Sequence, residues 1–258
     1  MLDTFESNPA DLVTKVEYDA IAQEYRDIKS KLPLVKFVEI PSLLSLAGNV
    51  NGLKVLDLAC GDGKYARLFK ALGATEVVGV DLSSEMIKLA KNQSNNISYF
   101  VGDAAKLLDL KLGQFDLVAA AYLLNYASSV AVLKAMIYSI KLSLKPNGRF
   151  VTLNDNPFDH PNKYAMHHQY GYFKSMSSQT PTLGAPIKYV VKNDNEQVAF
   201  FNYYMPGDVI KREFEEAGFA FQFVKPCVSE NDLPNAFWEN VEANAPCVLM
   251  EAILKDKS

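Results

Sequence analysis

Residues 55–63 read VLDLACGDG and decide the fold. Apolar residues run into a turn that holds two glycines, Gly61 and Gly63. Because glycine has no Cβ, such a turn lets the backbone approach a ligand closely, although a glycine pair between a strand and a helix also makes a plain tight turn. Two carboxylates, Asp57 and Asp62, flank the turn. The stretch predicts a strand followed by a helix, and a ligand that tolerates neighbouring acids.

Short apolar runs alternate with helical patterns through the first 155 residues. The predicted strands are Lys54–Leu58, Glu76–Asp81, Ile97–Val101, Phe115–Ala120 and Arg149–Asn154. The predicted helices between them are Lys64–Leu72, Ser84–Asn92 and Ser129–Leu144. Gly73 closes the first of these helices, Ser83 can cap the second, and Asn147–Gly148 after Pro146 marks a turn into the fifth strand. This alternation predicts an α/β fold, with parallel strands, right-handed crossovers and helices on both faces.

The flanking regions differ from this core. Residues 10–47 predict helices broken at Pro33 and Pro41, and residues 157–204 lose the alternation but hold ten Phe or Tyr residues. A helix and two late strands then complete a seven-stranded sheet; we predict them at Asp208–Ala217, Phe219–Val224 and Cys247–Leu254. We expect a single domain, 1–258, made of a helical cover (1–50), a core (51–156), an inserted lid (157–206) and a C-terminal helix with strands (207–258).

Composition excludes several classes of protein. The chain has 258 residues, of which 49% are hydrophobic and 22% charged, as is ordinary for a globular protein. Its net charge of -4 and the absence of a Lys/Arg cluster argue against a nucleic-acid partner. Three scattered cysteines favour neither a disulfide framework nor a zinc site. The acidic start and the lack of a long uncharged apolar run predict a cytoplasmic protein with no membrane association.

The carboxylates separate two nucleoside ligands. The spacing Gly61-x-Gly63-x-x-Ala66 fits a loose dinucleotide fingerprint, and Asp81 ends the next strand, where a carboxylate can bind both ribose hydroxyls. A dinucleotide places its pyrophosphate at the first helix N-terminus, where Asp57 and Asp62 would repel it. S-adenosylmethionine carries an ammonium and a sulfonium instead. A cationic nucleoside is therefore favoured over a dinucleotide. No metal is expected, because His167 and His168 are adjacent and neighbouring side chains diverge.

These pieces resemble the motifs of the class I S-adenosylmethionine-dependent methyltransferases over about residues 53–155. VLDLACGDG resembles the first motif, with Ala59 where glycine is commoner, and GVDLSSEMIKLA (79–90) resembles the second. VGDA (101–104), FDLVAAAYLLNYA (115–127) and LKPNGRF (144–150) resemble the third motif, the fourth strand with its exit, and the turn into strand five. The order and context of the five pieces make the resemblance specific.

The resemblance implies cofactor roles, which cover Asp57, Ala59, Gly61, Gly63, Asp81, Leu82, Met86, Asp103, Ala104 and Ala121. Asp81 would hold the ribose, while Leu82 and Met86 would sandwich the adenine. Asp103 would bind the adenine amino group and the Ala104 backbone the ring, with Ala121 near the methionine end. Plainer interpretations stay open, because Met86 and Leu82 can be core packing and Asp103 can cap a turn.

YDAIAQEY (18–25) is similar to a segment that many small-molecule methyltransferases carry on a helix covering the cofactor. Tyr18, Ile21, Ala22 and Tyr25 fall on one helical face. Tyr18 or Tyr25 would then contact the methionine portion and screen it from water. The alternative is an amphipathic helix that only packs its apolar stripe on the sheet.

The acceptor should lie beyond the carboxyl ends of strands four and five. The candidate acceptor-binding residues are Tyr122, Asn125, Tyr126, Asn154, His168 and Tyr203. Residues 156–173 hold all three histidines among aromatics, which indicates a lid over a flat acceptor, or else a packed insertion or dimer contact. His168, His160 and Asp155 are weak candidates for a general base, because transfer to an already nucleophilic atom needs only positioning and desolvation.

We therefore expect an enzyme that transfers a methyl group from S-adenosyl-L-methionine, leaving S-adenosyl-L-homocysteine, to N or O of a small aromatic or heterocyclic metabolite. YDAIAQEY, VLDLACGDG and YYMPGDVIKREFEEAGF (203–219) resemble the toxoflavin synthase-like subgroup. The alternatives are a non-catalytic S-adenosylmethionine-binding interaction protein and a nucleotide-dependent oxidoreductase. The predicted partner is a small-molecule acceptor, with the protein a monomer or homodimer.

Overall fold

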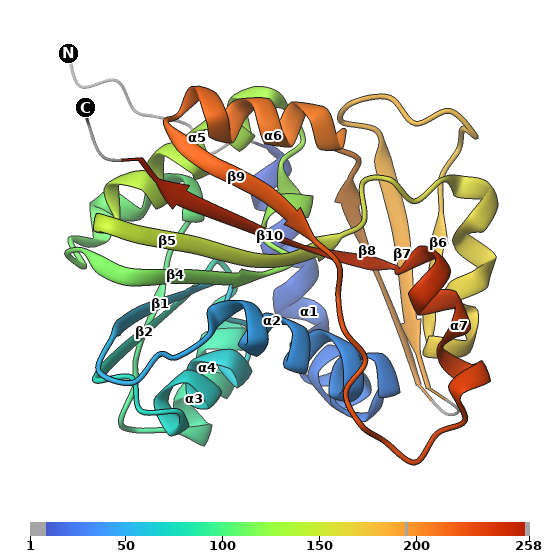
Figure 1. Ribbon diagram of the computed structural model, residues 1–258, viewed down its shortest axis with the longest axis horizontal. Helices are drawn as coiled ribbons and strands as arrows, with labels where there is room; N and C mark the ends of the chain where they lie inside the picture. The colour runs from blue at the N-terminus through green and yellow to red at the C-terminus, as the bar shows by residue number, and fades with distance from the viewer. Residues whose placement is uncertain (1–8, 194–195, 256–258) are drawn as a thin grey trace.

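The computed structural model describes residues 9–193 and 196–255, and of residues 9–17 the backbone alone. A seven-stranded sheet lies at its centre (Figure 1). Its strands are β1 (Lys54–Leu58), β2 (Glu76–Asp81), β3 (Ser98–Val101), β4 (Phe115–Ala121), β5 (Leu144–Asp155), β9 (Phe219–Val224) and β10 (Cys247–Leu254). The order is β3-β2-β1-β4-β5-β10-β9, and β10 runs antiparallel to both of its neighbours. The predicted α/β fold with seven strands is confirmed.

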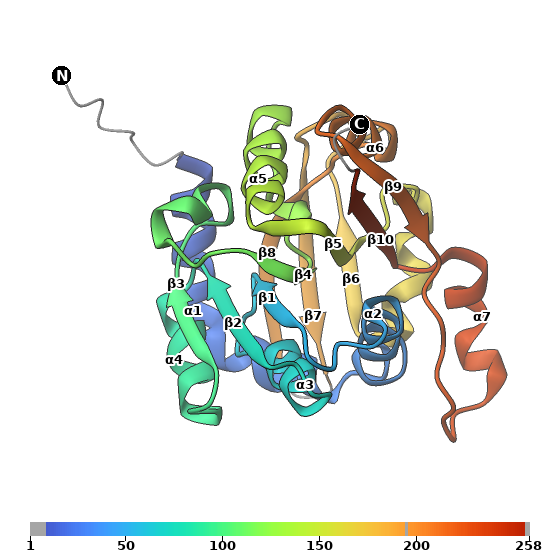
Figure 2. The same ribbon diagram turned by 60° about the vertical axis from the view of Figure 1, so that its left-hand side comes forward.

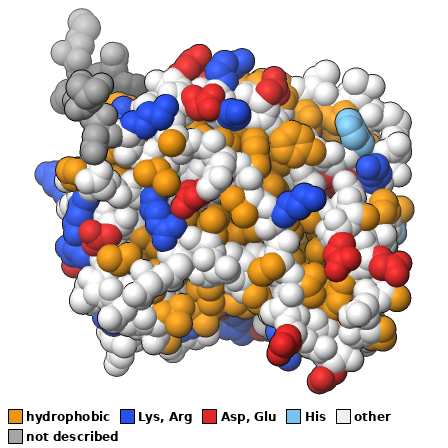
Figure 3. Space-filling model, viewed as in Figure 1, with side chains coloured by type: hydrophobic (Ala, Val, Ile, Leu, Met, Phe, Trp, Pro, Cys, Tyr) orange, Lys and Arg blue, Asp and Glu red, His pale blue; other side chains and the backbone are white. Residues whose placement is uncertain are grey.

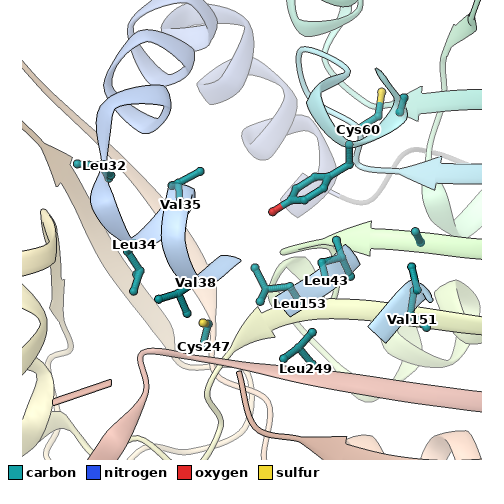
Figure 4. Close-up of a cluster of buried hydrophobic side chains, with 14 of the residues drawn as sticks. Leu32, Leu34, Val35, Val38, Leu43, Cys60, Val151, Leu153, Cys247 and Leu249 are labelled. Atoms are coloured by element: carbon teal, nitrogen blue, oxygen red, sulfur yellow. The ribbon is translucent and has the colours of Figure 1, made fainter. Parts of the chain in front are cut away.

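Helices cover both faces of this sheet, as Figure 1 shows. The helices on one face are α2 (Ile40–Ala47), α3 (Lys64–Ala71) and α4 (Ser84–Gln93), and those on the other are α5 (Val130–Leu142) and α6 (Gly207–Glu216). Side chains alternate along a strand, so β1 sends Val55 into one core cluster and Leu56 and Leu58 into the other. In Figure 4, Leu43 of α2 lies beside Val151, Leu153 and Leu249 of the sheet.

Two short helices follow the carboxyl ends of β3 and β4. These are the 3₁₀-helices η2 (Ala104–Leu110), after β3, and η3 (Leu124–Tyr126), after β4. Ser83 caps α4 as expected, because its side chain accepts a hydrogen bond from the Met86 N–H. Gly73 follows α3 with φ of 96°, a conformation that glycine adopts without strain.

The N-terminal segment corrects one prediction. Helix α1 (Pro9–Lys31) ends before Pro33, as expected, and Pro33 then begins the next helical stretch. Pro41 does not break a helix. A π-helical turn, η1 (Val35–Glu39), runs directly into α2 and places Pro41 in the first turn of α2. The wider π turn takes up the proline ring and its missing N–H.

The start of β5 also differs from the prediction. The strand begins at Leu144 instead of Arg149, and Leu144 pairs with Phe115 of β4. The Asn147–Gly148 dipeptide forms a bulge inside the strand, because the register with β4 shifts between Phe115 and Leu117 and Asn147 has φ of 61°. The turn signal in the sequence was real, but it marks an irregularity within β5.

Residues after β5 fold as a second, smaller sheet. It comprises β6 (Tyr172–Ser175), β7 (Pro186–Lys192) and β8 (Gln197–Tyr203), preceded by the 3₁₀-helix η4 (Pro161–Tyr170). Alternate residues of β7 are buried, so one face of this sheet is packed inside. Helix α1 packs against β7, β8 and α4, and Figure 2 shows α1 beside the carboxyl ends of β1 and β2.

Helix α7 (Asn235–Asn244) lies on the outside, next to η4 and β6 in Figure 1. On the face in Figure 3, the described basic and acidic side chains are intermixed with apolar ones and do not form one stripe. Among the helices of the described residues, none combines the length and apolar character needed to cross a membrane.

Candidate functional site

Two adjoining cavities open at the carboxyl ends of β1, β2 and β4. The first is lined by Tyr18, Tyr25, Ala59, Gly61, Val80, Asp81, Leu82, Ser83, Met86, Gly102, Asp103, Ala104, Ala121, Tyr122, Leu123, Tyr126 and Met136. The second is more highly charged and is lined by Tyr25, Arg26, Lys29, Val35, Glu39, Ala59, Cys60, Gly61, Asp62, Lys64, Tyr65, Met86, Ala121 and Tyr122. Six lining residues are common to both cavities, so the two form one elongated site.

The turn after β1 forms the floor between the cavities. Ala59, Gly61 and Gly63 all have positive φ, at 51°, 54° and 78°. A Cβ added to Gly61 would meet open space, so this backbone faces the cavity. A Cβ on Gly63 would collide with the Tyr99 ring, and Gly63 lines neither cavity. Gly61 thus provides the bare backbone that the sequence predicted, whereas Gly63 permits close packing.

Asp81 lies at the end of β2 and faces the first cavity. Its Oδ2 accepts a hydrogen bond from the Gly61 N–H at 2.8 Å, and its Oδ1 accepts one from the Ser83 N–H at 2.9 Å. These bonds fix the carboxylate between the glycine turn and the start of α4. Burial raises the pKa of Asp81 to about 6 despite these bonds, which favour the ionised form.

Asp57 is placed differently from the sequence-based expectation. It is 1% exposed beneath the glycine turn and lines neither cavity, and its Oδ2 has no hydrogen-bond partner within the described residues. Burial raises its pKa to about 8, and the carboxylates of Asp81 and Asp62 add to this effect. Asp62 is itself paired with Arg67 at 3.3 Å. The raised pKa keeps the proton on Asp57 at neutral pH, and Arg67 offsets the charge of Asp62.

The residues predicted around an adenine all lie along the first cavity. Leu82, Met86, Asp103 and Ala104 all line it. Asp103 Oδ1 also accepts a hydrogen bond from the Ala105 N–H at 2.8 Å and so caps η2. Asp103 therefore both caps a turn and lines the cavity, so the two interpretations are compatible. Met86 is 2% exposed and lies in the packed wall of the cavity.

Helix α1 closes the first cavity with aromatic rings. The Tyr18 and Tyr126 hydroxyls form a hydrogen bond, and the Tyr18 ring lies 5.3 Å from that of Tyr25 and 5.8 Å from that of Tyr126. Phe200 of β8 completes the group, with ring centroids 5.7 Å from Tyr18 and 5.5 Å from Tyr25. Burial raises the pKa of Tyr18, so this phenol stays neutral.

The second cavity contains an ion pair that the sequence analysis missed. Lys29 Nζ lies 3.2 Å from Glu39 Oε2, and both side chains are almost fully buried. Glu39 Oε1 also accepts hydrogen bonds from the hydroxyls of Tyr122, at 2.8 Å, and Tyr172, at 2.6 Å. Lys29 follows Tyr18, Ala22 and Tyr25 on one helical face, so extending that stripe by a turn would have found it. Nothing in the sequence marks Glu39.

Tyr122 stands where the two cavities meet. It follows the last residue of β4 with φ of 64°, a strained conformation for a bulky residue, and its N–H donates to Leu153 O at 2.6 Å. Lys29 Nζ lies 4.4 Å from its ring centroid. Such strain persists only where the surroundings hold it, and it concentrates at functional sites.

Three predicted acceptor-binding residues lie elsewhere. Asn125, Asn154 and Tyr203 line a separate small cavity behind η3, together with Asp155. Asn154 Nδ2 donates to Asn125 Oδ1 at 2.5 Å within this buried region. Within η3, Tyr126 lines the first cavity, whereas Asn125 lines the separate small cavity.

The histidines do not reach the site. His160 and His168 are exposed, and His168 stacks on Phe173 at 4.2 Å on the small sheet. His167 is buried and lies 3.5 Å from Asp159, and its Nε2 is 2.9 Å from Asn244 O. Asp155 pairs with Lys174 at 3.1 Å. The weak catalytic candidates His160, His168 and Asp155 therefore belong to the surface or to a buried ionic cluster that fastens the small sheet.

Comparison with known proteins adds sequence relatives. Residues 55–148 match a family model described as a methyltransferase domain. The chain is 34% identical over 182 residues to a demethylmenaquinone methyltransferase of Staphylococcus aureus, covering 65% of this chain and 68% of that protein. It is 27% identical over 153 residues to an uncharacterised protein of Haemophilus influenzae, covering 56% of this chain and 59% of that one.

Solved structures share the fold. A DhpI complex with S-adenosylhomocysteine aligns with a TM-score of 0.61 and 17% identity, over 98% of this chain and all of that one. An S-adenosylmethionine-dependent methyltransferase of Mesorhizobium loti aligns with a TM-score of 0.58 and 20% identity, over 83% and 97% of the two chains. At these identities the similarity concerns the fold alone.

Proposed function

The chain belongs to the class I S-adenosylmethionine-dependent methyltransferases, and we propose that it transfers the methyl group to N or O of a small aromatic or heterocyclic metabolite. The observation that carries the acceptor class is the aromatic wall that Tyr18, Tyr25 and Tyr126 form along the first cavity, with Phe200 of β8 packed behind Tyr18 and Tyr25. Edge-on aromatic rings of this kind favour a flat acceptor. The toxoflavin synthase-like subgroup stays a prediction.

The first cavity supports the adenosine roles inferred from the motifs. We assign the ribose hydroxyls to Asp81, which is held by the Gly61 and Ser83 N–H groups. The adenine would lie between Leu82 and Met86, with its amino group toward Asp103. An ionised Asp81 is required, because only the carboxylate accepts from both hydroxyls. No phosphate needs to be accommodated beside the glycine turn.

The second cavity fits the methionine portion of the cofactor. A methionine end carries a carboxylate and an ammonium, and this cavity offers Lys29, Lys64 and Arg26 for the first and Glu39 and Asp62 for the second. The sulfonium would then lie where the cavities meet, beside Tyr25, Ala121 and Tyr122. Aromatic faces there stabilise a cation. This arrangement explains why two compartments of different charge adjoin at Tyr122.

Methyl transfer in this site needs little from a general base. The cofactor supplies an electrophilic methyl carbon, and the acceptor atom must lie in line with the bond that breaks. Alignment contributes on the order of 7–11 kcal/mol in favourable cases. Tyr18 and Tyr126 exclude water from the same volume. We therefore assign catalysis to positioning and desolvation by the aromatic wall.

Acceptor identity is tested by turnover. Purified protein with labelled S-adenosylmethionine is offered heterocyclic amines, phenols and demethylmenaquinone, the acceptor in the name of the Staphylococcus relative. Methylation of a heterocycle or phenol supports the proposal, and exclusive methylation of the quinone would replace the acceptor class. Tight cofactor binding with no turnover would favour the alternative of a non-catalytic binding protein.

A further inference from the structure

Asp19 of α1 reaches across to the start of α4. Its Oδ1 accepts hydrogen bonds from the Ser83 hydroxyl at 2.6 Å and from the Glu85 N–H at 3.2 Å. Ser83 is the N-cap of α4, so Asp19 adds a carboxylate to a helix N-terminus already capped by its own side chain. A carboxylate there is stabilised by free N–H groups and by the helix dipole.

The same turn carries the ribose-binding carboxylate. The Ser83 N–H donates to Asp81 Oδ1, and the Gly61 N–H donates to Asp81 Oδ2. A continuous chain of hydrogen bonds therefore runs from α1, through Asp19, Ser83 and Asp81, to the glycine turn. Displacing α1 would remove the acceptor of the Ser83 hydroxyl and loosen the turn that aims Asp81 into the cavity.

Asp19 also determines where its neighbour lies. Adjacent residues on a helix point about 100° apart, so Asp19 faces α4 while Tyr18 faces the cavity. Docking Asp19 on Ser83 thus fixes the helix rotation at which the Tyr18 hydroxyl meets Tyr126. Asp19 therefore links the position of the ribose site to the position of the aromatic wall.

We propose that Asp19 is a positioning residue that couples docking of α1 to occupancy of the ribose site. The inference rests on the proposed cofactor site and adds that the cofactor and α1 stabilise one another. Coupling of this kind is reciprocal, so the factor by which docked α1 tightens the cofactor equals the factor by which the cofactor tightens α1. The acceptor wall is then complete only once the cofactor is bound.

The charges around Asp81 provide a second way to detect the coupling, through the pKa of Asp81. The titratable groups facing it are Asp19 from α1, Asp57 from β1 and Cys60 from the glycine turn. After burial, the carboxylate of Asp19 is the neighbouring charge that raises the pKa of Asp81. An amide at position 19 keeps an oxygen for Ser83 and Glu85 but removes that charge, which lowers the pKa of Asp81.

The coupling is tested with S-adenosylhomocysteine as the probe. Its affinity is measured by calorimetry, and exchange of the amides of residues 18–31 is measured with and without it, in the wild type and in Asp19→Ala. We expect Asp19→Ala to bind S-adenosylhomocysteine about tenfold more weakly. The slowing of amide exchange in α1 that the ligand causes should fall by the same factor. Glu24→Gln removes an exposed acid from the same helix and should match the wild type.

Asp19→Asn supplies an arm that does not depend on how well Asp19→Ala folds. Its affinity for S-adenosylhomocysteine at pH 7.5 should stay within about threefold of the wild type. When affinity is measured against pH, the loss of affinity on the acid side of the profile (its acid limb) should occur at lower pH than in the wild type. Wild-type affinity and protection in Asp19→Ala, or an unmoved acid limb in Asp19→Asn, overturn the proposal. Failure of the wild type itself to bind S-adenosylhomocysteine would instead refute the cofactor site.

Discussion

The hydroxyls of Tyr18 and Tyr126 hydrogen-bond to each other and join the cover helix α1 to the segment that follows β4. Both rings also line the first cavity, so this contact closes one side of it. It links a residue of the YDAIAQEY segment to one of the fourth-strand exit, two stretches that the sequence analysis had treated separately.

Replacing Tyr18 with phenylalanine tests that seal. The ring contacts with Tyr25 and Phe200 remain, so we expect S-adenosylhomocysteine affinity to change by less than about threefold, whereas methyl transfer should fall by about tenfold because water enters. Steady-state rates and calorimetry measure the two quantities. Tyr138→Phe, on an exposed tyrosine of α5, serves as the control. Equal losses in affinity and rate would contradict a sealing role.

Lys29 and Glu39 should show separable contributions to stability and binding. Lys29→Met leaves a buried carboxylate unpaired, which is expected to lower the free energy of unfolding by about 3–5 kcal/mol. Adding Glu39→Gln removes the uncompensated charge and should restore much of that stability, as followed by urea denaturation.

The double variant then isolates the binding role. Because it is stable but has lost the charges of Lys29 and Glu39, its affinity for S-adenosylmethionine should stay at least tenfold below that of the wild type. Recovery of both stability and affinity in the double variant would show that the pair is structural and would remove the methionine end from this cavity.

The raised pKa of Asp57 predicts that part of the free energy of unfolding is lost as pH rises, which is the opposite of the usual effect of an aspartate. Its folded pKa is about 8, above the unfolded value of about 3.9, so the folded state retains the proton. The associated stability is fully present below about pH 4 and is lost as pH rises through 8. Asp57→Asn should therefore unfold like the wild type near pH 4 and at a higher temperature near pH 9. An identical difference at both pH values would contradict the raised pKa.

The two glycines of the turn should respond differently to alanine. Gly63→Ala drives a Cβ into the Tyr99 ring at positive φ, so we expect a marked loss of thermal stability. Gly61→Ala meets open space and bears only the backbone strain, about 1–2 kcal/mol, but places a methyl group in the cavity. Its main effect should be weaker cofactor binding. Thermal melts with and without S-adenosylhomocysteine distinguish the two variants.

Sequence patterns were sufficient where structure is local. β1 and β2 have the predicted bounds, because apolar runs and glycine punctuation are properties of neighbouring residues. Ser83 caps its helix for the same reason. The motif residues Asp81, Leu82, Met86 and Asp103 lie around one cavity, since parallel strands bring their carboxyl ends to one edge.

Patterns failed where the outcome depends on long-range packing. Glu39 meets Lys29, Tyr122 and Tyr172 because the π turn after Pro33 aims its side chain at them. The aromatic segment 157–206 was expected to cover the acceptor, and that role stays a prediction. Its Phe200 packs on Tyr18 and Tyr25, whereas His160 and His168 lie exposed once β6–β8 pair as a sheet. Composition records which side chains are present and not which face of that sheet they occupy.

The central claim is that this elongated site binds a cationic nucleoside and not a dinucleotide. The most direct measurement is calorimetric titration of the purified protein with S-adenosylmethionine, S-adenosylhomocysteine and NADH at pH 7.5. The account predicts micromolar binding of the first two at one site per chain and no heat from NADH. Binding of NADH, or failure of both sulfur nucleosides to bind, would contradict the roles given to Asp81, Lys29 and Glu39 and leave only the fold.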